Sequence, residues 1–123
     1  MQNLRSGIDL VETSRLEGVD PLIRGRFLRR IFTLRELEEA NDSLLHLAGR
    51  FAAKEAVVKT LGCGIGPVSW QEIEIRRGQF GEPVLVLSGK ARQLADDLGL
   101  TTWTVSISHT KTYAVAVAVA CGE

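Results

Sequence analysis

Apolar residues recur every three or four positions from Leu44 to Leu61, the spacing that places side chains on one face of an α-helix. Ser43 precedes this segment and is a favourable N-cap residue, while Gly62 follows it and can end a helix in the left-handed conformation. The pattern therefore predicts one long helix at the centre of the chain.

Shorter segments on both sides of this helix alternate in polarity or carry capping residues. Thr33 and Glu36 have the spacing of a capping box, which predicts a short helix ending near Asn41. The other predicted elements are strands over residues 4–11, 70–76, 84–87, 103–108 and 113–120, and helices from Thr13 or Ser14 toward Arg30 and from Lys90 to Leu98. No repeat or linker divides the chain, so we expect one α+β domain over residues 1–123, with the long helix packed on a mainly antiparallel sheet.

The last predicted strand is apolar on both faces. Val115, Val117 and Val119 share one face, and the alanines between them share the other. Such a strand needs cover on both sides, and the chain is short, so we expect a subunit interface on one of them.

The charges balance, with 15 Lys and Arg residues against 15 Asp and Glu residues. An extended basic surface for nucleic acid is therefore not expected, and any charge recognition must be local. The N-terminus lacks a signal-peptide pattern, and the apolar run over residues 114–121 is too short to span a membrane. Two distant cysteines fit neither a disulfide framework nor a metal site, so we expect a protein of the reducing cytoplasm.

Two acidic residues lie in otherwise apolar surroundings. Asp9 is flanked by Ile8 and Leu10 in a predicted buried strand, and Glu55 lies among small residues of the long helix. Each has a purely structural explanation, since Asp9 can satisfy backbone N–H groups or pair with an arginine, and Glu55 can pair with a lysine. Alternatively, two carboxylates from separate elements would suit Mg²⁺, which leaves the rest of its shell to waters and phosphate oxygens.

The long helix also carries basic residues on neighbouring turns. Arg50 and Lys54 are four residues apart, as are Glu55 and Lys59, which fits either a solvated face with ion pairs or a phosphate-binding face. Three glycines follow in residues 62–66, and glycine loops can turn N–H groups toward phosphate oxygens. This loop follows a helix, however, and is therefore not a P-loop.

The two histidines lie in different settings. His109 begins a polar turn with Thr110 and Lys111, which is a compact set of donors for a phosphate or a base edge, although a histidine in such a turn is usually only solvated. His46 lies on the polar side of the long helix, and we assign it no role.

Three segments together form a known pattern, namely Gly7–Glu12 (GIDLVE), Arg50–Ala56 (RFAAKEA) and Ser106–Thr110 (SISHT). Their order and separation resemble the three motifs of the holo-acyl-carrier-protein synthase family of phosphopantetheinyl transferases. The similarity extends over essentially the whole chain. It implies an α+β fold that forms a homotrimer with active sites between subunits, which agrees with the doubly apolar last strand.

The resemblance also implies roles for individual residues. Asp9 and Glu55 match carboxylates that hold Mg²⁺, or Mn²⁺ in its place, against the pyrophosphate of coenzyme A. Residues implied to hold the phosphates and the adenosine end of coenzyme A are Arg50, Lys54, Lys59, Gly62, His109 and Thr110, and those implied to dock the acidic carrier protein are Arg15, Arg24, Arg26 and Phe27.

The implied reaction is attack by a serine hydroxyl of an acyl carrier protein on the β-phosphorus of coenzyme A, which releases adenosine 3′,5′-bisphosphate and serves fatty acid or polyketide biosynthesis. The acceptor of the serine proton stays open between Lys59, Glu55 and a metal-bound water. Two other classes of protein would explain the same residues. One is a trimeric module that binds coenzyme A or another nucleotide without turnover, and the other is a structural oligomer whose acidic residues pair internally with Arg50 or Lys54.

Overall fold

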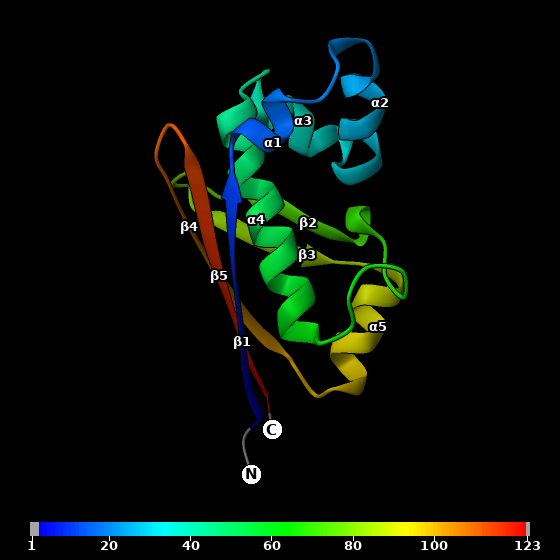
Figure 1. Cartoon of the computed structure of the whole chain (residues 1–123). Coiled ribbons are helices and arrows are strands. Elements are labelled where there is room, and N and C mark those ends of the chain that lie inside the picture. Colours follow the sequence, from blue (N-terminus) through cyan, green and yellow to red (C-terminus); the bar gives the residue numbers. More distant parts are fainter. Residues whose placement is uncertain (1–2, 123) are drawn as a thin grey trace.

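The computed structural model describes residues 3–122 and has α4 at its centre (Figure 1). Its elements in chain order are β1 (Asn3–Glu12), α1 (Ser14–Glu17), α2 (Pro21–Ile31), α3 (Leu34–Ala40), α4 (Leu44–Leu61), the 3₁₀ segment η1 (Trp70–Glu72), β2 (Ile73–Arg77), β3 (Pro83–Leu87), α5 (Gly89–Asp97), β4 (Thr102–His109) and β5 (Tyr113–Gly122). Helices α1 to α3 gather at one end of the molecule, and α5 lies toward the end where both chain termini are found. The α+β fold with a long central helix is as the sequence predicts.

Two antiparallel sheets flank the central helix. The larger has the strand order β1-β5-β4, and the smaller pairs β2 with β3. Helix α4 packs on β1 and β5, and its own small residues Ala52, Ala53 and Ala56 are fully buried. The alanines of β5 are buried and its valines are more exposed, because successive side chains of a strand point to opposite faces.

The outer face of the larger sheet is uncovered in the single chain. Leu4, Ile8 and Leu10 of β1 have exposed fractions of 72%, 61% and 62%, and Val117 of β5 lies beside them on the same face. Apolar side chains concentrated in this way on a sheet face are typical of an interaction surface.

Gly7 allows β1 to approach α4 closely. A Cβ atom at this position would lie 2.7 Å from the Thr60 hydroxyl oxygen, so any larger residue would push the strand away from the helix. Gly7 and Asp9 are two residues apart and therefore face the same side of the strand. The close approach at Gly7 thus brings Asp9 to the surface of α4.

Local capping signals located α3 and α4 correctly. The Thr33–Glu36 capping box forms at the start of α3, and Asn41 ends that helix in the left-handed conformation. Ser43 caps α4 by accepting the N–H of His46, and Gly62 ends it with φ of +73°. The hairpin of β4 and β5 also forms as predicted.

Two sequence predictions need correction. The helix expected from Thr13 toward Arg30 is split into α1 and α2, because Asp20 and Pro21 start a new helix with an Asp N-cap and proline in its first turn. Thr13 does not cap α1 with its side chain, and its hydroxyl donates to the Lys111 carbonyl at 2.9 Å instead. The strand expected from Trp70 begins at Ile73, after the 3₁₀ turn η1.

None of the helices within residues 3–122 combines the length and the apolar character that crossing a membrane requires.

Candidate active site

Asp9, Glu55 and Lys59 come together where β1 crosses α4. The Lys59 ammonium donates to Asp9 Oδ1 at 3.0 Å and to the carbonyl oxygen of Ile8 at 2.9 Å. Glu55 lies one helical turn before Lys59 on the same face of α4. The Lys59 side chain is 53% exposed and the Asp9 side chain 15%, so solvent and ligands can reach this pair.

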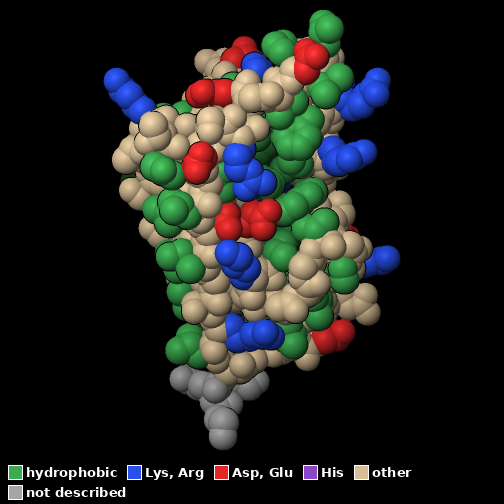
Figure 2. Space-filling view, in the orientation of Figure 1, with side chains coloured by type: hydrophobic (Ala, Val, Ile, Leu, Met, Phe, Trp, Pro, Cys, Tyr) green, Lys and Arg blue, Asp and Glu red, His purple; other side chains and the backbone are tan. Residues whose placement is uncertain are grey.

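The electrostatic setting of Glu55 is unusual for a surface glutamate. Partial burial raises the pKa of Glu55, and the negative charge of Asp9 raises it further, while Arg15 and Lys59 act in the opposite direction. Two neighbouring carboxylates of this kind attract a cation. Figure 2 shows acidic side chains at the middle of the face where β1 and α4 run, with basic side chains above and below them.

A cavity of about 460 Å³ opens beside these residues. It is lined by Glu55, Val58, Lys59, Gly62, Gly64, Ile65 and Trp70. The glycine loop therefore borders the same space as Glu55 and Lys59. Arg5 adds a positive charge here that the sequence did not indicate, since its guanidinium lies 2.7 Å from where a Cβ of residue 62 would be.

Lys54 does not share this cavity, although it adjoins Glu55 in the chain. Its ammonium is fully buried and pairs with the equally buried carboxylate of Glu36 at 2.8 Å. It also donates to the carbonyl oxygens of Trp70 and Ile73 at 3.0 and 2.6 Å, which occupies all three of its donors. In the structure, therefore, Lys54 has no donor left for a phosphate and holds buried oxygens of Glu36, Trp70 and Ile73 instead.

The Lys54–Glu36 pair supports the wall of the first cavity that Trp70 forms. Glu36 also accepts the backbone N–H groups of Thr33 and Ile75, so all the polar atoms of this buried pair have partners. Trp70, held through its carbonyl by Lys54, packs its ring on Phe51 with centroids 5.3 Å apart. The buried pair thus sets the position of Trp70 in the cavity wall.

Arg50 and His109 meet in a second cavity of about 270 Å³, which shares no lining residue with the first. Its walls are formed by His46, Gly49, Arg50, Arg77, Gly81, Pro83, Ile107 and His109. Burial lowers the pKa of Arg50, and its Nε atom is buried without a hydrogen-bond partner. Within one chain, the residues expected to bind coenzyme A therefore lie in two separate cavities, with Lys59 and Gly62 in the first and Arg50 and His109 in the second.

Thr110 adjoins His109 but uses its polar groups to close the β4–β5 turn. Its N–H donates to the Tyr113 carbonyl at 2.8 Å, and its hydroxyl oxygen accepts the N–H groups of Thr112 and Tyr113. Its direct effect in the structure is to hold the turn that presents His109.

The four expected docking residues fall into two groups. Arg15 and Arg26 are exposed, and the Arg15 guanidinium lies 5.6 Å from the centre of the Phe51 ring, close enough to Glu55 to influence its pKa. Arg24 instead donates to the carbonyls of Glu17 and Val19, which fastens the link between α1 and α2. Phe27 is half-buried and packs against the core.

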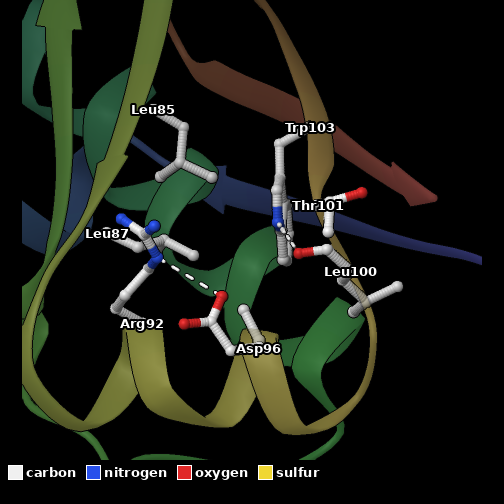
Figure 3. Close-up of a pocket in the computed structure, with 8 residues that line it drawn as sticks. Leu85, Leu87, Arg92, Asp96, Leu100, Thr101 and Trp103 are labelled. Carbon is white, nitrogen blue, oxygen red and sulfur yellow. Dashed lines mark hydrogen bonds and ion pairs between the residues drawn. The ribbon is translucent and has the colours of Figure 1, made fainter. Parts of the chain in front are cut away.

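A third cavity, of about 250 Å³, lies between β3, α5 and the start of β4 (Figure 3). Leu85, Leu87 and Trp103 form part of its walls. The two charged residues that line it, Arg92 and Asp96, pair with each other at 3.3 Å. The Asp96 carboxylate offsets the Arg92 charge, so this cavity has no net positive charge, and it shares no lining residue with the other two.

Sequence reasoning missed three residues that shape these cavities. Trp70 was expected only as a strand residue, and Glu36 only as a capping residue. His46 was assigned no role, yet it is half-buried and lines the cavity of Arg50 and His109. The signal that could have found His46 is its four-residue spacing from Arg50, which places both on one helix face.

Comparisons with known proteins agree with this arrangement. The family model of the 4′-phosphopantetheinyl transferase superfamily matches residues 5–118. A holo-[acyl-carrier-protein] synthase from Moorella thermoacetica is 49% identical over 118 residues, covering 94% of this chain and 91% of that protein. One from Herpetosiphon aurantiacus is 40% identical over 126 residues, covering 97% and 99%.

Solved structures give the same result. The holo-[acyl-carrier-protein] synthase of Helicobacter pylori in complex with coenzyme A superposes with a TM-score of 0.85 at 33% identity, covering 94% of this chain and 98% of that one. The Bacillus anthracis structure in complex with CoA (3′,5′-ADP) has a TM-score of 0.78 at 35% identity, covering 97% and 96%. With its acidic pair, its glycine loop and these relatives, the chain belongs to the holo-acyl-carrier-protein synthase family of the 4′-phosphopantetheinyl transferase superfamily.

Proposed function

We propose that this enzyme transfers 4′-phosphopantetheine from coenzyme A to a serine of an apo acyl carrier protein in a Mg²⁺-dependent reaction that releases adenosine 3′,5′-bisphosphate. The observation that carries the proposal is the group formed by Asp9, Glu55 and Lys59 at the mouth of an open cavity. It offers two carboxylates for a metal and an accessible cation for a phosphate.

The donor set fits Mg²⁺, or Mn²⁺ in its place. Among residues 3–122, no three His, Cys, Asp or Glu side chains are grouped closely enough to hold a metal by themselves. Two carboxylates suit a hard cation that completes its shell with waters and substrate phosphate oxygens. When bound, such an ion neutralises negative charge that develops on the phosphoryl oxygens.

The side chains around the cavity have distinct tasks. Lys59 can turn from Asp9 to a phosphate oxygen of coenzyme A, because its side chain is half exposed. The loop after Gly62 borders the same space, with Arg5 beside it. The candidate acceptors of the serine proton among the residues of this chain are Glu55 and Lys59.

We propose that three chains assemble through the outer face of the larger sheet and complete the active site between them. The exposed Leu4, Ile8 and Leu10 support this assembly, since it would remove them from water. The division of the coenzyme A ligands between two separate cavities supports a site shared by two chains. Light scattering during gel filtration should give the mass of three chains, and a monomer mass would contradict the assembly.

The carrier protein is proposed to dock beside α1 and α2. Arg15 and Arg26 are exposed cations there, and Leu22 and Ile23 of α2 are exposed apolar residues. This combination suits an acidic, amphipathic partner. Arg26→Glu should raise the KM for the carrier about tenfold, more strongly at low salt, and leave the KM for coenzyme A unchanged. Equal changes in both KM values would contradict the docking site.

Mass spectrometry of an apo acyl carrier protein tests the proposed reaction. The carrier is incubated with the enzyme, coenzyme A and Mg²⁺, and parallel samples contain EDTA or the Glu55→Gln enzyme. The phosphopantetheine mass should appear on the carrier serine only in the first sample. Fatty acid and polyketide carriers tested in parallel would identify the preferred acceptor. Binding of coenzyme A without any mass shift on these carriers would indicate a non-catalytic module instead.

A further inference from the structure

The second cavity concentrates positive charge. Arg50, Arg77, His46 and His109 all line it, and no Asp or Glu residue does so. They come from α4, the end of β2 and the end of β4, so only the folded chain brings them together. A cavity lined in this way is suited to an anion that binds without a metal ion.

Two of these side chains each have a buried nitrogen atom without a hydrogen-bond partner. Arg50 Nε and His46 Nε2 are buried and make no hydrogen bond. A buried polar atom without a partner costs free energy that a ligand atom can recover. The carboxylate of Glu39, whose charge acts on both side chains, already has partners: it pairs with Arg35 at 3.5 Å and accepts the backbone N–H of Arg77 at 2.9 Å.

The same charges keep His46 neutral in the absence of ligand. Burial lowers the pKa of His46, followed by the charges of Arg50 and Arg77 and, more weakly, His109, while Glu39 opposes them. A phosphate in the cavity would reverse this balance, because its negative charge favours the protonated imidazole.

We propose that His46 is an anion ligand in this cavity, where it recognises the 3′-phosphate of coenzyme A and makes that recognition dependent on pH. This inference rests on the proposed function, in which Arg50 and His109 hold a coenzyme A phosphate. The pyrophosphate is the group that a metal ion at Asp9 and Glu55 would hold, and the second cavity has no carboxylate to share a metal. The remaining anion of coenzyme A is the 3′-phosphate.

The direction of the pH effect follows from the charges. At neutral pH His46 is neutral in the free enzyme and takes up a proton when the phosphate binds. Its contribution to affinity is therefore largest at low pH and fades as the pH rises through the pKa of the bound state. Arg77 stays charged at all these pH values, so its contribution should not change in this way.

The test compares coenzyme A with its 3′-dephospho form as donors. Selectivity is the ratio of kcat/KM for the two donors, measured at pH 6.0 and pH 8.5 for the parent enzyme, His46→Gln and Arg77→Gln. We expect His46→Gln to lower the ratio about tenfold at pH 6.0 and much less at pH 8.5. Arg77→Gln should lower it similarly at both pH values. Titration of the phosphate itself affects all three enzymes equally, so it cancels in the comparison.

Calorimetry tests the role of His46 in a binding measurement that does not require the transfer reaction. Binding of coenzyme A is measured at pH 7 in two buffers that differ in ionisation enthalpy, which reports the protons taken up. The parent should take up more protons than His46→Gln, and the dephospho form should cause no such difference. Equal uptake by parent and variant, or a ratio that His46→Gln leaves unchanged at pH 6.0, would overturn the role of His46. Failure of carrier modification with either donor would instead overturn the proposed function.

Discussion

Two lysines of α4, five residues apart, form ion pairs in opposite surroundings. Lys54 pairs with Glu36 at 2.8 Å, and both side chains are fully buried. Lys59 pairs with Asp9 at 3.0 Å, and its side chain is half exposed. Both are lysine–carboxylate pairs, and they differ in their exposure to solvent and in the number of carbonyl oxygens that the lysine also contacts.

The difference separates a pair that has no free donor from one that a ligand can reach. Lys54 has all its donors occupied by Glu36 and two carbonyls, so releasing it would leave several buried polar groups without partners. Lys59 can exchange Asp9 for water or phosphate at little cost, since exposed ion pairs contribute little to stability. The motif over residues 50–56 contains Lys54 and not Lys59, yet of the two lysines only Lys59 has an exposed side chain in this chain.

The largest expected effect is on stability, from breaking the buried pair. Lys54→Met leaves the Glu36 carboxylate buried without its cation, which should lower the free energy of unfolding by about 3–5 kcal/mol. Urea unfolding at constant protein concentration measures the loss. Adding Glu36→Gln removes the stranded charge and keeps one oxygen to accept one of the two backbone N–H groups, so the double variant should regain part of the lost stability. A Lys54→Met protein as stable as its parent would contradict the structural role.

The next effect is on activity, from neutralising Glu55. Glu55→Gln should lower kcat/KM on the order of 10³-fold, because a metal ligand that stabilises the transition state contributes several kcal/mol. Its free energy of unfolding should change by less than about 1 kcal/mol. Glu38→Gln is the matched control, since Glu38 is an exposed glutamate of α3 and lies on neither β1 nor α4. Retention of most activity by Glu55→Gln would refute the metal assignment.

A smaller effect is expected from Lys59, the exposed member of the comparison. Lys59→Gln should change the free energy of unfolding by only about 0–1 kcal/mol. The KM for coenzyme A should rise about tenfold, because one charged contact to phosphate is lost. Lys59→Arg, which keeps the charge, should lie between the parent and Lys59→Gln in the same kinetic assay. A loss of stability as large as that of Lys54→Met would remove the distinction between the two pairs.

The smallest effect is the pH dependence of stability that Glu55 causes. Burial and the Asp9 charge raise the pKa of Glu55, so the folded chain holds a proton there more tightly than the unfolded chain. This contribution is present below the pKa of the unfolded chain and is lost as the pH rises through the folded value. Without Mg²⁺, the melting temperature of the parent relative to Glu55→Gln should therefore fall between weakly acidic and neutral pH. A constant difference over that range would contradict the raised pKa.

Elements that depend on local signals could be predicted from the sequence. The capping box at Thr33, the N-cap at Ser43 and the terminal Gly62 act within one helical turn, and the helices that they delimit were located correctly. The helix expected from Thr13 was wrong because the Asp20–Pro21 start signal was overlooked. The 3₁₀ turn at Trp70 was not predicted, although Ser69 and Glu72 have the spacing of a capping box and the Ser69 N–H donates to the Glu72 carboxylate at 2.8 Å.

The sequence by itself determined the family, the central helix and the residues from which a metal and phosphate site could be built, because motifs and capping residues are local in the chain. Only the tertiary structure decided which of those residues share a cavity. It buried Lys54 beside Glu36, left Lys59 open beside Asp9, and placed His46 with Arg50 and His109. The physical reason is that burial and electrostatic partners depend on contacts between segments distant in the chain, which residue spacing alone does not specify.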